Sequence, residues 1–217
     1  QSGMPHRLQG FASNQENDPY RLDENGYPRD HVTEEALRFL SKNKQHPTFL
    51  YYASWLVHTP IQTRSKQLLE KYCEKLGVPY PEDPKGWTLE GQRNPYYCAM
   101  VETLDYYVGR LLEYLEETDD PRWSGHKLIE NTYIIFSSDN GGMEGHHNVV
   151  FTDNFPLDKG KIHIREGGIR VPFIISGPRV KSGVVSEVVV NGLDFYPTIL
   201  GWTGTANSAK QILDGSD

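Results

Sequence analysis

The sequence predicts an α/β domain of three layers, in which helices flank a largely parallel sheet. Helical patterns alternate along the chain with short, continuous apolar runs, which are typical of strands buried on both faces. A chain of 217 residues is long enough for a sizeable domain with a buried core. We therefore expect a single domain, with a loop-rich segment at 1–30 and a core of helices and strands at 31–217.

The first half of the chain supports this pattern element by element. Residues 1–30 are rich in Asn, Asp, Pro and Gly and predict a long surface connection. A helix is predicted from Thr33 to about Lys44, where Glu34 and Glu35 suit the positive end of the helix dipole. The run T-F-L-Y-Y-A at 48–53 predicts a buried strand, and a short helix is expected around 67–76.

The clearest periodic element is a helix from about Pro95 to Glu117. Its apolar residues recur at spacings of three and four; they are Tyr97, Met100, Val101, Leu104, Val108, Leu111, Leu112 and Leu115. Gly109 costs a helix about 1 kcal/mol relative to Ala, so we expect a neighbouring backbone to approach closely there.

Strands dominate the prediction for the second half. A buried strand at Thr132–Phe136 is followed by a loop dense in Gly and His, a second buried run at 171–176 and a strand at 184–190. A short helix is expected from Asp194 to about Trp202.

Charge and composition exclude several classes of protein. The net charge of −7 disfavours nucleic acid as a partner, and no run approaches the roughly 20 apolar residues of a membrane span. The first residues lack the order of a secretory signal. Cys73 and Cys98 fit no metal motif and are expected as thiols or as one disulfide.

The motif S-S-D-N-G-G at 137–142 directly follows a predicted strand. Ligands of open α/β sheets bind beyond the carboxyl ends of strands. Asp139 and Asn140 offer adjacent hard oxygens, and the glycines after them relax the backbone, which favours Ca²⁺ or Mg²⁺ over Zn²⁺. The alternative is an ordinary turn, for which D-N-G-G is also typical.

Two further features point to chemistry on an anion. His58 follows the first predicted strand and suits proton transfer at neutral pH, although a lone histidine before a turn is more often structural. The segment 156–172 carries an excess of cations in an acidic chain, which predicts an anion site or, alternatively, a solvated loop with paired charges. Its charged and titratable residues, with two histidines just before it, are His146, His147, Asp158, Lys159, Lys161, His163, Arg165, Glu166 and Arg170.

Taken together, these segments resemble the sulfatase family of the alkaline-phosphatase superfamily. F-L-Y-Y-A-S followed by His58-Thr59-Pro60 resembles the family's strand and histidine, and S-D-N-G-G resembles its second pair of calcium ligands. Lys161, four further residues and E-G-G-I-R-V-P resemble its K-x4-E-G-G motif. The match runs from about Tyr27 to Ser216.

The resemblance implies roles for individual residues. Asp139 and Asn140 would bind one Ca²⁺, with two further ligands outside this chain. His58 would contact the sulfate and protonate the leaving oxygen, and Lys161 would neutralise its charge. In related zinc phosphatases the D-N pair is typically D-H, so Asn140 favours the calcium branch.

Departures from the family pattern predict an internal fragment. The family's formylglycine nucleophile is made within C/S-x-P/A-x-R, which neither Cys73 nor Cys98 matches. Its first pair of metal-binding aspartates is missing, since Asp119-Asp120 ends a predicted helix. We expect the chain to be inactive alone and to need the remainder of its own domain as a partner.

The resemblance also implies a substrate class and a location. A sulfated small molecule or polysaccharide is expected, bound by His146, His147 and Arg165, with Trp55 and Trp87 as further candidates, in a periplasmic or secreted enzyme. Two alternatives are a phosphate or phosphonate ester hydrolase of the same superfamily and a non-catalytic pseudoenzyme that binds an anionic glycan.

Overall fold

The computed structural model describes residues 10–81, 93–144, 151–208 and 211–217. The chain forms two compact units, Gln1–Val180 and Lys181–Asp217.

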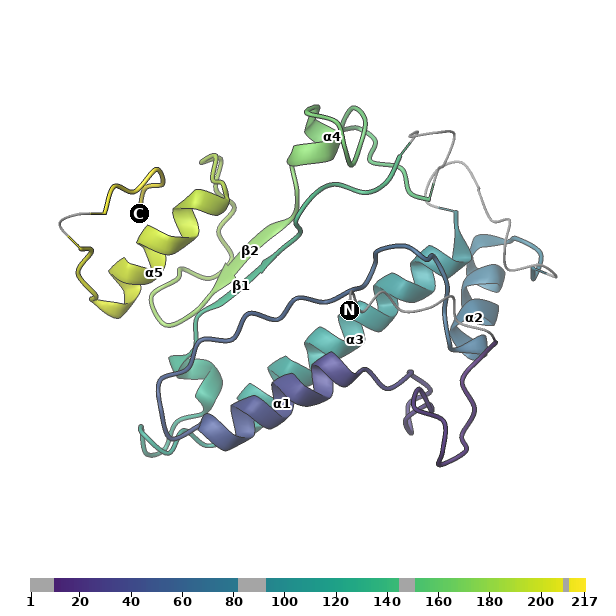
Figure 1. The fold of residues 1–217 in the computed structure, drawn as a ribbon, viewed down its shortest axis with the longest axis horizontal. Coiled ribbons are helices and arrows are strands. Elements are labelled where there is room, and N and C mark those ends of the chain that lie inside the picture. The colour runs from purple at the N-terminus through teal and green to yellow at the C-terminus, as the bar shows by residue number, and fades with distance from the viewer. Residues whose placement is uncertain (1–9, 82–92, 145–150, 209–210) are drawn as a thin grey trace. The chain divides into compact units, whose positions relative to one another are not determined.

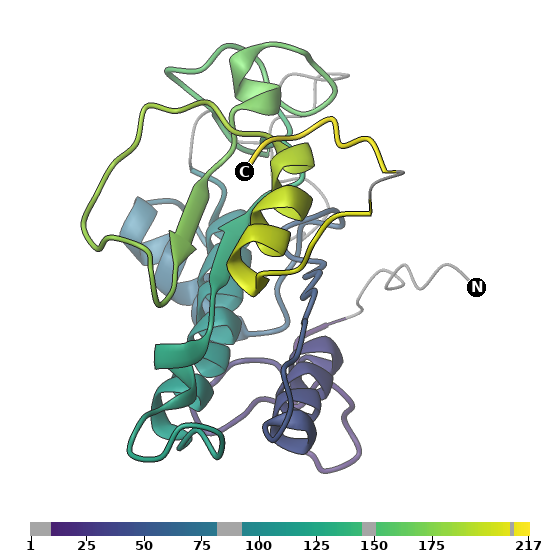
Figure 2. The ribbon, with the colours of Figure 1, turned by 90° about the vertical axis from the view of Figure 1, so that its left-hand side faces the viewer.

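The first unit contains the helices α1 at His31–Asn43, α2 at Lys66–Leu76 and α3 at Pro95–Glu117 (Figure 1). Each helix begins after a capping side chain, because Asp30, Ser65 and Asn94 accept hydrogen bonds from backbone N–H groups of the first turn. α3 packs against both α1 and α2, and Figure 2 shows α1 and α3 in the lower part of this unit. The predicted bounds of these helices are confirmed to within two residues.

The contact between α2 and α3 forms a small apolar core. Leu69 and Cys73 of α2 pack with Val78 and with Tyr96 of α3. Cys73 and Cys98 are both free thiols, and burial raises the pKa of each. The structure therefore decides against the disulfide.

The buried face of α3 differs from the predicted apolar stripe. It consists of Pro95, Tyr96, Ala99, Met100, Thr103, Tyr107, Leu111 and Leu115. Tyr107 and Thr103 are buried because their hydroxyl groups donate to the carbonyls of Pro28 and Ala99, whereas the predicted Val101 is 46% exposed. No described atom lies within 4 Å of a Cβ added at Gly109, so the expected close approach there is wrong for the described residues.

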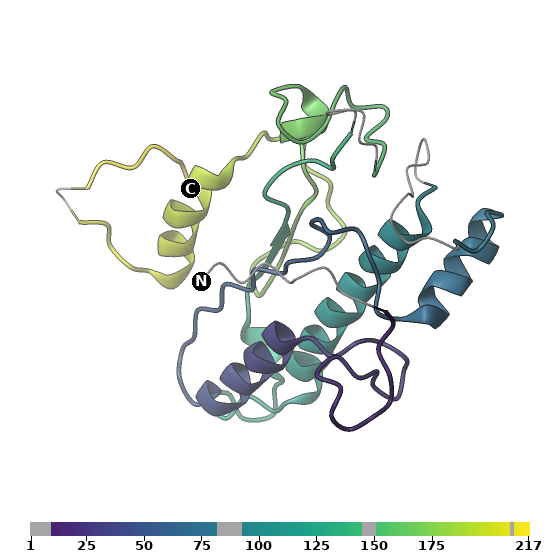
Figure 3. The same ribbon diagram turned by 45° about the vertical axis from the view of Figure 1, so that its right-hand side comes forward.

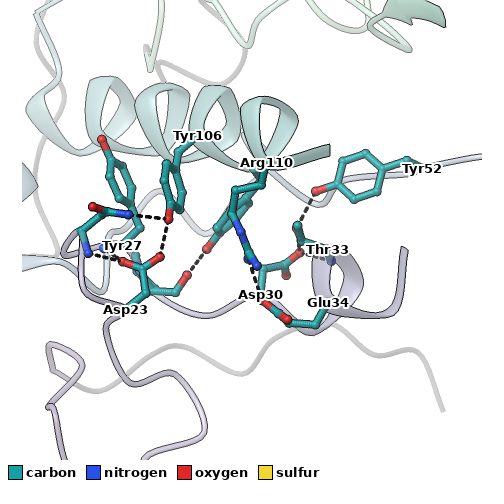
Figure 4. Close-up of polar contacts among 11 residues, drawn as sticks. Asp23, Tyr27, Asp30, Thr33, Glu34, Tyr52, Tyr106 and Arg110 are labelled. Atoms are coloured by element: carbon teal, nitrogen blue, oxygen red, sulfur yellow. Dashed lines mark hydrogen bonds and ion pairs between the residues drawn. The ribbon is translucent and has the colours of Figure 1, made fainter. Parts of the chain in front are cut away.

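Polar contacts fasten the segment before α1 to α3 (Figure 4). The Tyr106 hydroxyl donates to Asp23 at 2.7 Å, and the ring of Tyr106 stacks on Tyr27 with centroids 3.8 Å apart. Farther along α3, Arg110 forms an ion pair with Glu34 of α1 at 2.6 Å. The last part of the predicted surface connection, from Asp23 to Pro28, is thus fixed to α3.

The sheet in the first unit is an antiparallel pair. β1 at Ile134–Ser137 pairs with β2 at Phe173–Ser176, with Ile134 opposite Ser176 and Ser137 opposite Phe173. The 3₁₀-helix η1 at Leu128–Asn131 packs on α3 and leads into β1. The prediction of a largely parallel sheet is therefore not confirmed by the residues that the structure describes.

Two apolar runs predicted as strands form no ladder. Residues 48–53 are extended and run in the same direction as β1 (Figures 1 and 3), but no described backbone hydrogen bond pairs them with a neighbour. Phe49 and Tyr51 are 72% and 82% exposed. Residues 184–190 are likewise unpaired and exposed. These predictions are wrong for this structure because periodicity identifies residues suited to a sheet and cannot supply the strands that pair with them.

The second unit contains the 3₁₀-helix η2 at Gly192–Asp194 and the helix α5 at Phe195–Thr203, which confirms the helix predicted near Asp194. The Asp194 carboxylate accepts from the backbone N–H groups of Asn191 and Ser216 at 2.8 and 2.9 Å, and so ties the end of the chain to this helix. Across the described ranges, every helix is too short or too polar to cross a membrane.

Candidate active site

The two expected calcium ligands, Asp139 and Asn140, and the expected sulfate-binding Lys161 lie on one connection, residues 138–172, between β1 and β2. Asp139 and Asn140 follow the last residue of β1 almost directly. Lys161 lies on the return path, which passes through the short helix α4 at Glu166–Ile169 before β2 begins (Figure 1). The paired strands therefore hold both ends of the connection in place.

Two backbone hydrogen bonds dock the halves of this connection. We call residues 139–142 the ligand loop and residues 158–168 the lysine loop. Gly141 N–H donates to the Gly168 carbonyl, and Lys161 N–H donates to the Gly142 carbonyl, both at 2.9 Å. The lysine loop is closed on itself because Gly167 N–H donates to the Asp158 carbonyl at 2.8 Å.

This docking requires glycine at particular positions. A Cβ added at Gly141 would overlap the carbonyl oxygen of Gly167, and a Cβ added at Gly167 would overlap that of Lys159. Backbone atoms cannot shift as a flexible side chain can, so these contacts exclude larger residues. The glycines of both motifs serve to bring two stretches of main chain into contact.

The side chains of the ligand loop fit a hard cation. Asn140 Nδ2 donates to the Gly141 carbonyl at 3.0 Å, and Ser138 Oγ donates to the Asn140 carbonyl at 2.8 Å. Within the described residues, the Asn140 amide oxygen and the exposed Asp139 carboxylate accept no hydrogen bond. Two neighbouring oxygens of this kind suit Ca²⁺, which takes six to eight oxygen ligands.

These two residues would be only part of such a site. No cluster of three or more His, Cys, Asp or Glu side chains suited to a metal occurs in the part of the chain that the structure describes. Further ligands would have to come from elsewhere.

Among the cations of the lysine loop and Arg170 just after it, some form ion pairs with described residues and others do not. Arg165 pairs with Asp158 at 3.5 Å and Arg170 with Glu166 at 3.4 Å, all of them well exposed. Such surface pairs contribute about 0–1 kcal/mol and exchange partners at little cost. The ammonium groups of Lys159 and Lys161 form no ion pair with any described residue, which leaves them to meet an anion.

His58 is exposed and is held by its own segment. Its Nδ1 lies 3.0 Å from the Thr59 carbonyl, and its ring meets Trp55 edge-on at 5.2 Å. Because a carbonyl only accepts, this contact is a hydrogen bond in the neutral tautomer that carries its proton on Nδ1, and in that tautomer Nε2 is unprotonated. No described hydrogen bond or ring contact joins His58 to the ligand loop or the lysine loop. His146, His147 and Trp87 lie outside the described residues.

A family model for sulfatases matches residues 3–205. The chain belongs to the sulfatase family. It is 36% identical over 176 residues to a sulfatase from Formosa agariphila, covering 78% of this chain and 28% of that protein. It is also 30% identical over 187 residues to the N-acetylgalactosamine-6-sulfatase of Canis lupus familiaris, covering 85% and 30%. A third relative is the multifunctional alkaline phosphatase superfamily protein PehA from Trinickia caryophylli, 31% identical over 115 residues, with 52% and 19% covered.

The sulfatase chain spans less than a third of the length of these relatives. Sulfatase membership implies the α/β fold of the alkaline-phosphatase superfamily, within which the described β1–β2 pair is one antiparallel element.

One residue at the junction of the ligand loop and the lysine loop escaped the motif-based prediction. Asn154 lies between the two motifs in T-D-N-F-P, a sequence typical of a turn. Its side chain nevertheless contacts both the ligand loop and the lysine loop. The sequence feature that could have identified Asn154 is its position, since it places an amide between two glycine-rich motifs.

Proposed function

We propose that this chain supplies part of the calcium site and a sulfate-binding lysine of a sulfuric ester hydrolase that acts on a sulfated carbohydrate. The observation that carries the proposal is the docking of the ligand loop on the lysine loop through Gly141 and Lys161. Docking places two hard oxygens and a lysine without a described ion-pair partner on adjacent backbone segments. Membership of the sulfatase family gives this arrangement its chemistry.

In this proposal, the residues of the chain bind and orient the sulfate. Asp139 and Asn140 would hold Ca²⁺, which when bound offsets the charge of the sulfate oxygens. Lys161, fixed through its backbone at Gly142, would face the same anion, and Arg165 would exchange Asp158 for a sulfate or a neighbouring acidic group. A formylglycine nucleophile and two more calcium ligands would come from outside this chain. Preorganised charge of this kind is worth about 3–4 kcal/mol for each donor.

We propose His58 as the general acid for the leaving oxygen. Its Nδ1 proton is held by Thr59, so Nε2 would carry the transferable proton after protonation. In the complete protein, His58→Ala should slow hydrolysis of sugar sulfates by roughly 10²–10⁴-fold. Aryl sulfates, whose leaving groups need no proton, should lose far less. Rates on matched sugar and aryl sulfates test this, and equal losses on both would reject the acid role.

The function itself is tested by giving the complete protein matched sulfate and phosphate esters of one alcohol, with and without calcium. Calcium-dependent hydrolysis of the sulfate ester is expected. Preference for the phosphate ester would favour the second candidate, a phosphate or phosphonate ester hydrolase. The similarity of the chain to PehA supports this candidate. Binding of a sulfated glycan without turnover would favour a pseudoenzyme.

We further propose that residues 1–217 form a central part of one catalytic domain of a periplasmic or secreted enzyme. The apolar surface that the described residues leave exposed, including Phe49, Tyr51 and Ile174, supports the incomplete domain, and membership of the sulfatase family supports the location. Fractionation of cells that express the complete protein tests the location.

A further inference from the structure

The side chain of Asn154 bridges the two loops of the site. Its Oδ1 accepts from the Gly142 N–H at 3.3 Å, and its Nδ2 donates to the Gly142 carbonyl at 3.1 Å, so the amide pairs with both backbone groups of one ligand-loop residue. The same Nδ2 lies 3.1 Å from the Lys159 carbonyl in the lysine loop. One amide therefore contacts both loops at the point where they meet.

The carboxylate of Glu144 also accepts hydrogen bonds from Asn154. Its Oε2 accepts from the backbone N–H of Asn154 at 2.7 Å and from Nδ2 at 3.2 Å. A carboxylate strengthens hydrogen bonds to the groups that donate to it. The Glu144 carboxylate thus fixes the orientation of Asn154 through two of its groups, the backbone N–H and the side-chain Nδ2.

The lysine-loop contact falls on a strained residue. Lys159 has a φ of 64°, in the left-handed region that residues other than glycine seldom occupy. Its carbonyl accepts from Asn154 two residues before Lys161. The amide therefore stabilises the backbone conformation from which Lys161 projects.

We propose that Asn154 is a positioning residue that sets the spacing between the calcium ligands and Lys161, with Glu144 as its anchor. This inference rests on the proposed sulfatase function. Asparagine suits the task because its amide offers a donor and an acceptor side by side, as the N–H and carbonyl of Gly142 require. Aspartate has the same shape, but its carboxylate cannot donate. It would repel the carbonyl oxygens of Gly142 and Lys159 and the carboxylate of Glu144.

The test compares Asn154→Ala and Asn154→Asp with Asn43→Ala in the complete protein. Asn43 is a matched control, since its Nδ2 also donates to a carbonyl, that of Phe39, at the exposed end of α1. Calcium affinity is measured by titration calorimetry, and kcat and KM are measured on a sulfate ester. Supporting groups around metal ligands typically change affinity or activity by about 10–100-fold. We expect losses of that size in calcium affinity and in kcat for both Asn154 variants, and none for Asn43→Ala.

The readouts separate failure of this inference from failure of the proposed function. Asn154 variants that bind calcium and turn over like Asn43→Ala would overturn the positioning role and leave the sulfatase function intact. If the parent protein cleaves no sulfate ester, the function fails and calcium affinity alone decides the role of Asn154. If the Asn154 variants do not fold, the calcium affinity of Glu144→Ala is measured instead. A loss smaller than the about 10–100-fold expected for Asn154 supports the positioning role, and an affinity equal to that of the parent protein contradicts it.

Discussion

At the scale of single residues, Glu102 of α3 joins two other parts of the first unit. Its carboxylate accepts from the Tyr27 hydroxyl at 2.7 Å and from the Lys71 ammonium of α2 at 2.7 Å. Burial alone would raise its pKa, but hydrogen bonds from Lys71, Tyr27 and Tyr72 outweigh that effect and lower the pKa below its ordinary value of 4.5. The ionised form is therefore the stabilising one.

The pH dependence of stability follows from this shift. A lowered pKa adds stability that is present above about pH 4.5 and is lost as the pH falls through the folded-state pKa. Glu102→Gln should therefore be less stable than the parent at pH 7, with a gap that closes on acidification. Urea unfolding at a series of pH values measures this.

Glu70→Gln is the control, because among the described residues Glu70 forms a single, exposed ion pair, with Lys66 at 3.4 Å, of a kind worth about 0.2–0.5 kcal/mol. A gap for Glu102→Gln that is the same at every pH would contradict the argument.

Single residues also show what the sequence can and cannot predict about the site. Asp139, Asn140 and Lys161 could be selected as candidates because each belongs to a local motif, and backbone hydrogen bonds dock the segments that carry them. Asn154 was missed because its partners Gly142 and Lys159 lie on opposite sides of it in the chain, and a turn sequence does not encode such contacts.

Among the secondary-structure elements, the helix α3 contains a glycine, Gly109, whose presence no contact of the described residues explains. Gly109 meets nothing described within 4 Å. Gly109→Ala should therefore stabilise the protein by up to about 1 kcal/mol, because alanine restricts the unfolded chain and favours the helix. Thermal unfolding of the complete protein measures the change. Destabilisation would mean that another part of the complete protein packs against this position.

Helices were predicted well and strands poorly, for a physical reason. The first turns of α1, α2 and α3 are capped by Asp30, Ser65 and Asn94, and between its end turns a helix forms its backbone hydrogen bonds within itself. A strand depends on a partner distant in sequence, so the runs at 48–53 and 184–190 kept their apolar character without forming a ladder.

At the scale of the whole molecule, the β1–β2 pair is apolar on both faces. Phe136 lies opposite Ile174 on one face, and they are 38% and 60% exposed, while Ile135 lies opposite Ile175 on the other. Sheets that are apolar on both sides are normally covered on both sides. An uncovered face fits the proposal that further chain completes this domain.

Ile174→Lys tests that proposal. A true surface position tolerates such a change to within about 0.5 kcal/mol. If further chain covers Ile174 in the complete protein, a buried unpaired charge should destabilise it by several kcal/mol or prevent folding. Denaturant unfolding and soluble yield distinguish the two, and parental stability would reject the proposed domain arrangement.

The lysine loop is fastened through main-chain atoms and glycines, while Ile162 and Ile164 point their side chains largely into solvent, at 62% and 89% exposure. In the function proposed above, this arrangement would separate sulfate binding from the choice of substrate. Residues on the outside of the loop would be able to change with the substrate, because no described hydrogen bond that holds Lys161 uses the side chains of Ile162 or Ile164.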